Sequence, residues 1–124
     1  MFTFISEYKG LGEVLKDQKL AALGDAYVNF IYSVALSKRK GEPTGAKVES
    51  RLLAVALRKA GLRSLLPSRI DRHKQADAAE ALIVYAWVRG VMTIEEGVSI
   101  LGQREDMAEA FCLFLLTARR KLDL

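Results

Sequence analysis

Apolar residues recur at steps of three and four along most of this chain, a spacing that places side chains on one face of an α-helix. The clearest case is the stretch from Gln18 to about Arg39, which we predict to be one long helix. The basic residues at 38–40 and the glycine at 41 are typical of a helix C-terminus. The predicted apolar face comprises Leu20, Leu23, Tyr27, Phe30, Ile31 and Val34.

The same periodicity predicts four further helices. Thr93 and Glu96 stand three residues apart before an apolar run, which is typical of a capping box at a helix N-terminus. No segment alternates apolar and polar residues as a half-buried strand would, so we expect an all-α fold. We predict a loop over residues 62–71, and helices that begin after Pro43 with Thr44 as the cap, span about 72–89, follow Thr93, and span about 104–121.

The composition adds few constraints. With 124 residues, of which 51% are hydrophobic, the chain suits one packed domain, and we assign residues 1–124 to it. The uninterrupted apolar runs are well below the roughly 18 residues of a membrane span, so we expect no membrane partner. The N-terminus lacks the pattern of a secretory signal, and the single cysteine allows no internal disulfide. We therefore expect a cytoplasmic protein.

Three carboxylates lie in segments that are otherwise apolar. Asp25 is the only formal charge between residues 20 and 36, and Asp77 and Glu80 are the only charges between residues 76 and 88. Burying an unpaired carboxylate costs several kcal/mol, so such groups lose their charge, pair with a cation or bind a metal. This pattern raises the hypothesis of a metal-dependent site.

The spacing of these acids fits such a site. Asp77 and Glu80 share one helix face because they are three residues apart. Asp25 comes from another helix, where Gly24 permits close approach of a neighbour and Asn29, one turn later, is a candidate hydrogen-bond partner. Converging carboxylates would hold Mg²⁺ or Mn²⁺. The alternative is that the acids lie on solvated helix faces or accept structural hydrogen bonds.

The net charge of +4 is modest, and its distribution is more informative than its size. Basic residues gather at 38–40, 69–74 and 119–121. Such groups at helix ends are usual and favour solubility. The middle group, however, immediately precedes the helix that carries two of the acids. Cations beside an acidic site are what a substrate with a phosphate backbone would require.

Two motifs and the segment between them resemble the ribonuclease III endonuclease domain. The sequence LGDA at residues 23–26 is similar to the end of the family pattern ERLEFLGD, and QADAAEAL at 75–82 is similar to ADxxEALIG. Between them, VESRLLAVALRKAGLRSLLP at 48–67 resembles the family's VSEENLAELARELGLGEYLL. The order and approximate spacing agree over residues 19–90. The resemblance implies an all-helical homodimer that cuts double-stranded RNA with a divalent metal.

By this resemblance Asp25, Asp77 and Glu80 are the catalytic residues and the ligands of Mg²⁺ or Mn²⁺. Gln18 and Ala21 replace two glutamates of the family's first motif, so one usual metal ligand is absent at Ala21. The short Mini-III form of the family is similar in lacking that glutamate. It also has no separate double-stranded-RNA-binding domain, and it is regarded as catalytic.

Candidate contacts of the RNA backbone are Lys47, Arg51, Arg72 and Lys74, with a solvated helix face as the alternative for Lys47 and Arg51. The leading hypothesis for function is a metal-dependent endoribonuclease acting on double-stranded or structured RNA. The alternative is a noncatalytic RNA-binding or ribosome-associated protein of the same fold, and an unrelated helical dimerisation protein is the third hypothesis. A separate protein that supplies an RNA-binding module would be a further partner.

Overall fold

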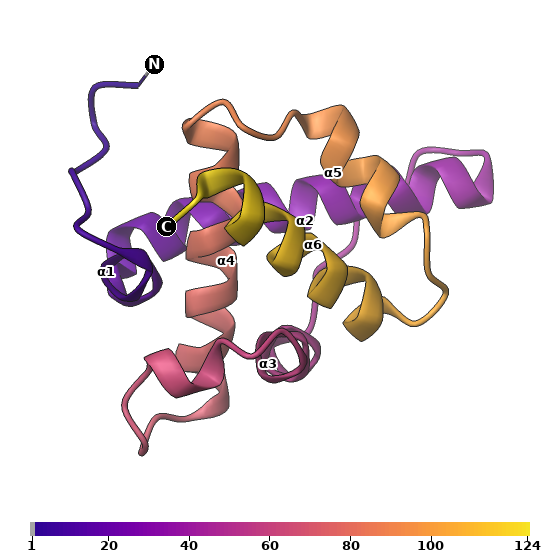
Figure 1. The fold of residues 1–124 in the computed structure, drawn as a ribbon. Coiled ribbons are helices and arrows are strands. Elements are labelled where there is room, and N and C mark those ends of the chain that lie inside the picture. The colour runs from indigo at the N-terminus through magenta and orange to yellow at the C-terminus, as the bar shows by residue number, and fades with distance from the viewer. Residues whose placement is uncertain (1) are drawn as a thin grey trace.

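The computed structural model describes residues 2–124, and within that range every regular element is helical (Figure 1). The prediction of an all-α fold is therefore confirmed. The elements are α1 (Leu11–Lys16), α2 (Gln18–Lys40), α3 (Ser50–Lys59), the short 3-10 helix η1 (Arg63–Leu65), α4 (Arg72–Val88), α5 (Ile94–Leu101) and α6 (Met107–Leu122).

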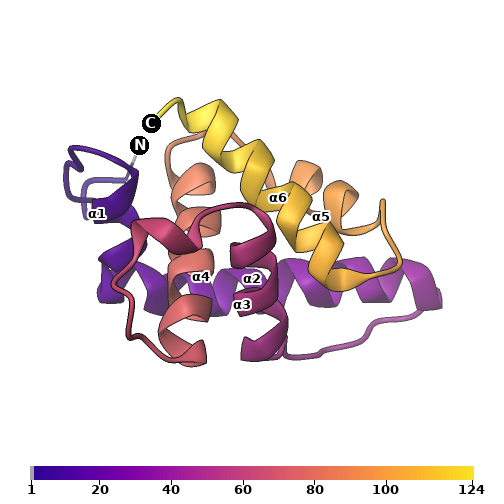
Figure 2. The same cartoon turned by 60° about the horizontal axis from the view of Figure 1, so that its bottom comes forward.

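Helix α4 forms the centre of the protein. Most of its residues are buried, including all of residues 78–86, and a helix that is apolar on all sides is typical of such a position. It contacts α1, α2, α3 and α6, and its most extensive contact is with α2. In both views α2 is the longest element and runs across the molecule, crossed by α4 (Figures 1 and 2). The core is therefore built on the α2–α4 pair.

The two helices approach most closely at Gly24 of α2. A Cβ atom added to Gly24 would lie 2.2 Å from the backbone oxygen of Glu80, a separation that real Cβ atoms essentially never show. Only glycine allows this crossing. Because Asp25 follows Gly24 directly, the crossing also brings Asp25 next to Glu80.

The helices with the strongest periodicity agree with their predicted ranges. α2 ends at Gly41, whose φ of 73° lies in the left-handed region that favours glycine. Asp17 caps the other end of α2, where its carboxylate accepts two backbone N–H groups. The capping box is confirmed, because Thr93 Oγ accepts the Glu96 N–H at 3.0 Å and Thr93 N–H donates to Glu96 Oε1.

Other helix boundaries were predicted wrongly. The helix expected after Pro43 begins only at Ser50, because side chains of α2 bind the backbone N–H groups of the preceding loop. α6 begins at Met107 instead of near residue 104, since Asp106 caps it. α1 was not predicted, because its six residues are too few to show a helical period.

Part of the predicted apolar face of α2 is exposed. Leu20, Tyr27 and Ile31 are buried as expected, but Leu23 is 37% exposed and Phe30 is 55% exposed. The reason is that α4 and α5 cover only one side of α2. Leu23 and Phe30 therefore form an uncovered apolar stripe, a name we keep for these two residues.

α2 is also long and apolar enough, by length and composition alone, to cross a membrane. A core helix of a soluble protein passes the same test. We interpret α2 as a core helix, because it packs against α4 and α5 and carries Asp25 and Asn29 near the middle of its length.

Candidate active site

One pocket brings the three predicted site carboxylates together. Asp25 on α2, with Asp77 and Glu80 on α4, lines a pocket of about 350 Å³ where the two helices cross. Lys47, from the loop that precedes α3, lines it as well. The other lining residues are Gln18, Ala21, Ala22, Val48, Ser50 and Leu53.

Glu80 is the buried member of the group, with only 6% of its surface exposed. Burial, a hydrogen bond with the Asp25 side chain and the negative charges of Asp25 and Asp77 together raise the pKa of Glu80 to about 8, against the opposing positive charge of Lys47. At neutral pH the metal-free protein therefore favours the protonated form of Glu80.

Asp25 is exposed, although its apolar neighbours in the sequence favoured a buried position. The difference arises because the side of α2 that carries Asp25 opens onto the pocket. Asn29, one turn later, donates from Nδ2 to Asp25 Oδ1 at 3.1 Å. The amide oxygen of Asn29 accepts the Val48 backbone N–H at 2.7 Å. Asn29 therefore orients the Asp25 carboxylate and ties it to the loop before α3.

Asp77 lies one turn before Glu80 and is half-buried. Burial raises the pKa of Asp77, the charge of Lys74 opposes that rise, and the charge of Asp25 adds to it. His73 opposes the rise as well. The first turn of α4 thus places Lys74 close to the acidic pocket, as the order of residues in the sequence predicts.

Three polar side chains of α2 hold residues 44–48 against the helix. They stand four residues apart, so they line up along one face of α2. The pairs are Ser37 Oγ with the Thr44 N–H (2.9 Å), Ser33 Oγ with the Ala46 N–H (2.9 Å) and Asn29 Oδ1 with the Val48 N–H (2.7 Å). We call this set the loop clamp. These side chains accept hydrogen bonds from backbone N–H groups that would otherwise pair with backbone carbonyl groups in a helix. They also fix the backbone next to Lys47.

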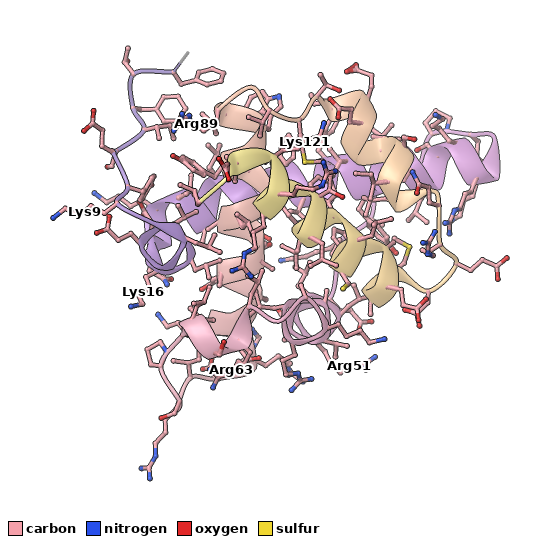
Figure 3. The ribbon with its side chains drawn as sticks, in the orientation of Figure 1. Lys9, Lys16, Arg51, Arg63, Arg89 and Lys121 are labelled. Carbon is pink, nitrogen blue, oxygen red and sulfur yellow. The ribbon has the colours of Figure 1, made fainter. Side chains whose placement is uncertain are left out.

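The remaining predicted RNA contacts lie outside the pocket. Arg72 and Lys74 are exposed in the first turn of α4. Arg51 lines a separate depression with Lys59 and Asp106, and its side chain extends outward from α3 (Figure 3). The structure therefore groups Lys47 with the acids, places Lys74 beside them and separates Arg51 from them.

The donor set of the pocket fits a hydrated divalent ion. Within residues 2–124 the ion pairs are Lys59–Glu109 and Lys121–Glu96, so none of the three acids has a protein cation as a direct partner. Carboxylate oxygens suit Mg²⁺ and Mn²⁺, and Mg²⁺ usually takes one or two carboxylates while it keeps several waters. In the same range no three His, Cys, Asp or Glu side chains are close enough to hold an ion together. Waters would therefore complete the coordination.

The raised pKa of Glu80 predicts that the metal-free protein loses stability as the pH rises. The unfolded chain releases this proton near 4.5, whereas the folded chain keeps it until about pH 8. The proton on Glu80 therefore stabilises the fold fully below about pH 4.5, and this stabilisation is lost progressively as the pH rises to about 8. We expect the thermal midpoint in EDTA to fall by roughly 5 °C or more over that range. An equal fall in Glu80→Gln would assign the effect to another group.

A comparison with protein families gives a match that includes the pocket. Residues 18–114 match a family model described as Ribonuclease III. This match covers well over half of the chain, including α2, α3, α4 and every residue that lines the acidic pocket. A comparison with curated proteins gives no match.

Proposed function

The chain belongs to the ribonuclease III family, and from that premise we propose that it is a metal-dependent endoribonuclease that hydrolyses phosphodiester bonds in double-stranded or structured RNA. The observation that carries the proposal is the pocket in which Asp25, Asp77 and Glu80 meet without a paired protein cation. In a family of RNA nucleases, an acidic pocket of this kind is best explained as a site for a divalent ion.

The three acids and Asn29 have distinct parts in this proposal. Asp25 and Glu80 would hold the ion, and Asp77 would add a third negative charge beside them. A bound Mg²⁺ or Mn²⁺ would activate a water molecule and would stabilise negative charge on the phosphate. Asn29 keeps the Asp25 carboxylate oriented through its hydrogen bond. Glu80 must release its proton to become a ligand, so ion binding is coupled to deprotonation.

The RNA backbone would contact the cations in and beside the pocket. Lys47 lines the pocket, and Lys74 is close enough to Asp77 to oppose the rise of its pKa. Binding through phosphates weakens steeply with added salt, and proteins that bind A-form duplexes contact 2′-hydroxyl groups across the shallow groove. We therefore expect a preference for duplex RNA over duplex DNA.

The test is incubation of the purified protein with a labelled RNA duplex in Mg²⁺, in Mn²⁺ and in EDTA, with a DNA duplex of the same sequence as the control. We expect internal cuts in the RNA in either metal, none in EDTA, and an intact DNA duplex. An RNA duplex that stays intact at every metal concentration would contradict the proposal.

A noncatalytic RNA-binding protein is the second candidate function. The observation in its favour is that Gln18 and Ala21, which replace two glutamates of the family pattern, both line the pocket. Neutral residues thus occupy part of the site. A protein of this kind would bind the RNA duplex equally well in Mg²⁺ and in EDTA, and it would leave the duplex uncut.

We also propose that two copies associate through the uncovered apolar stripe of α2. Phe30 borders an apolar groove formed with residues 43–46 of the following loop, and Leu23 lies two turns earlier on the helix. A second copy would remove this surface from water. Two-fold symmetry would then place the same stripe of both copies in one interface.

Phe30→Asp should convert the dimer to a monomer at micromolar concentration, because it places a charge in the proposed interface. Its ring is more than half exposed in the single chain, so the fold should survive. The measurement is sedimentation velocity. Leu116→Asp, at an exposed apolar position of α6, is the matched control and should remain dimeric. A parent protein that sediments as a monomer would rule this interface out.

A further inference from the structure

We propose that the ammonium group of Lys47 supplies the second positive charge of the acidic site, so that the pocket takes one divalent ion instead of two. This inference rests on the proposed function. Within residues 2–124, Lys47 is the one Lys or Arg that lines the pocket with Asp25, Asp77 and Glu80. Two-metal nucleases use a second ion to stabilise charge on the reacting phosphate. A lysine whose backbone position is held by its neighbours would provide part of that stabilisation.

The backbone on both sides of Lys47 is fixed to α2 by the loop clamp. The Ala46 N–H donates to Ser33 Oγ at 2.9 Å, and the Ser33 hydroxyl has its nearest acceptor in the Asn29 carbonyl oxygen of the same helix, at 2.7 Å. On the other side, Asn29 accepts the Val48 N–H and also binds Asp25. One amide side chain therefore sets the position of the loop relative to the acid. The Lys47 backbone is held within side-chain reach of the pocket before any ligand binds.

The charge balance of the pocket favours a single ion. One divalent ion and one lysine neutralise three ionised carboxylates, whereas a second divalent ion would leave two surplus positive charges. The other polar lining residues, Gln18 and Ser50, are neutral, and Ala21 offers no side-chain oxygen. The pocket thus lacks the additional acid that would compensate for a second ion.

Counting bound ions tests this inference without relying on cleavage. Mn²⁺ is titrated into the parent, Lys47→Met and Lys47→Glu, and free Mn²⁺ is followed by electron paramagnetic resonance. We expect one ion per chain in the parent. Lys47→Met should also bind one ion, about tenfold more tightly, because a like charge is removed. Lys47→Glu supplies a fourth acid and should bind two ions per chain.

Two further variants serve as controls for the charge of Lys47. Lys47→Arg keeps the charge and should bind one ion with the affinity of the parent. Lys9→Met removes a lysine that points outward from the N-terminal segment (Figure 3), and it should change neither the number of ions nor their affinity. Lys47→Met should cut RNA more slowly than the parent despite its tighter ion binding, because a charge that stabilises the phosphate is lost.

Two ions per chain in the parent would overturn the inference and leave the proposed function intact. The same applies if Lys47→Met binds Mn²⁺ with unchanged affinity, or if Lys47→Glu still binds one ion. A parent that binds no Mn²⁺ and cuts no RNA would overturn the proposed function and this inference with it. The two failures are therefore distinguishable.

Discussion

Glu80→Gln should reduce metal-dependent cleavage by roughly a hundredfold or more, because an ion worth several kcal/mol to the transition state loses a ligand. The substitution removes a charge and almost no volume, so the helices should pack as before. In EDTA above about pH 8 its thermal midpoint should equal or exceed that of the parent, since the buried position no longer carries a charge.

The matched control for Glu80→Gln is Glu49→Gln. Glu49 is exposed just before α3, and its side chain makes no capping hydrogen bond. Glu49→Gln therefore makes the same chemical change outside the pocket, and it should leave cleavage unaffected. Glu80→Gln with the cleavage rate of the parent would remove Glu80 from the proposed site.

Gly24→Ala should destabilise the protein by about 3 kcal/mol or more, the upper end of the range for overpacked cores. The added methyl group would lie 2.2 Å from the Glu80 oxygen and 2.5 Å from the Glu80 carbonyl carbon. These are backbone atoms, so the helices must move apart, and Asp25 and Glu80 would separate with them. Thermal unfolding at one fixed protein concentration measures the effect, because association also contributes to apparent stability.

Gly12→Ala is the control for Gly24→Ala. Gly12 is also within a helix, but a Cβ atom there would meet nothing within 4 Å. Alanine favours the helix more than glycine by roughly 1 kcal/mol, so this variant should be as stable as the parent or slightly more so. Equal stability of Gly24→Ala and Gly12→Ala would contradict the close crossing of α2 and α4.

The sequence predicts the helices whose apolar periods are long. α2 and α4 extend over several turns, so their positions follow from the pattern alone. Which side of α2 faces the core does not follow, because it depends on which helices cover it. Leu23 and Phe30 share the helical spacing of buried residues and yet lie outside the cover of α4 and α5.

The grouping of the three acids was also predictable, and the reasons are local. Glycine before Asp25 and the spacing of three between Asp77 and Glu80 are visible in the sequence. The place of Lys47 was not predictable, because it depends on hydrogen bonds across 13 and 19 residues, from Ser33 to Ala46 and from Asn29 to Val48. The signal that was available is the spacing of four between the polar residues Asn29, Ser33 and Ser37 on an otherwise apolar helix.

Binding of a divalent ion by the acidic pocket is tested most directly by thermal unfolding of the parent, Asp25→Asn and Glu80→Gln, each in EDTA and in Mg²⁺. A ligand that binds only the folded state raises the midpoint. We predict that Mg²⁺ raises the midpoint of the parent by several degrees, that neither variant responds, and that both variants are as stable as the parent in EDTA. A parent without any response to Mg²⁺, together with marked destabilisation of both variants, would show that the acids are structural and would contradict a metal site.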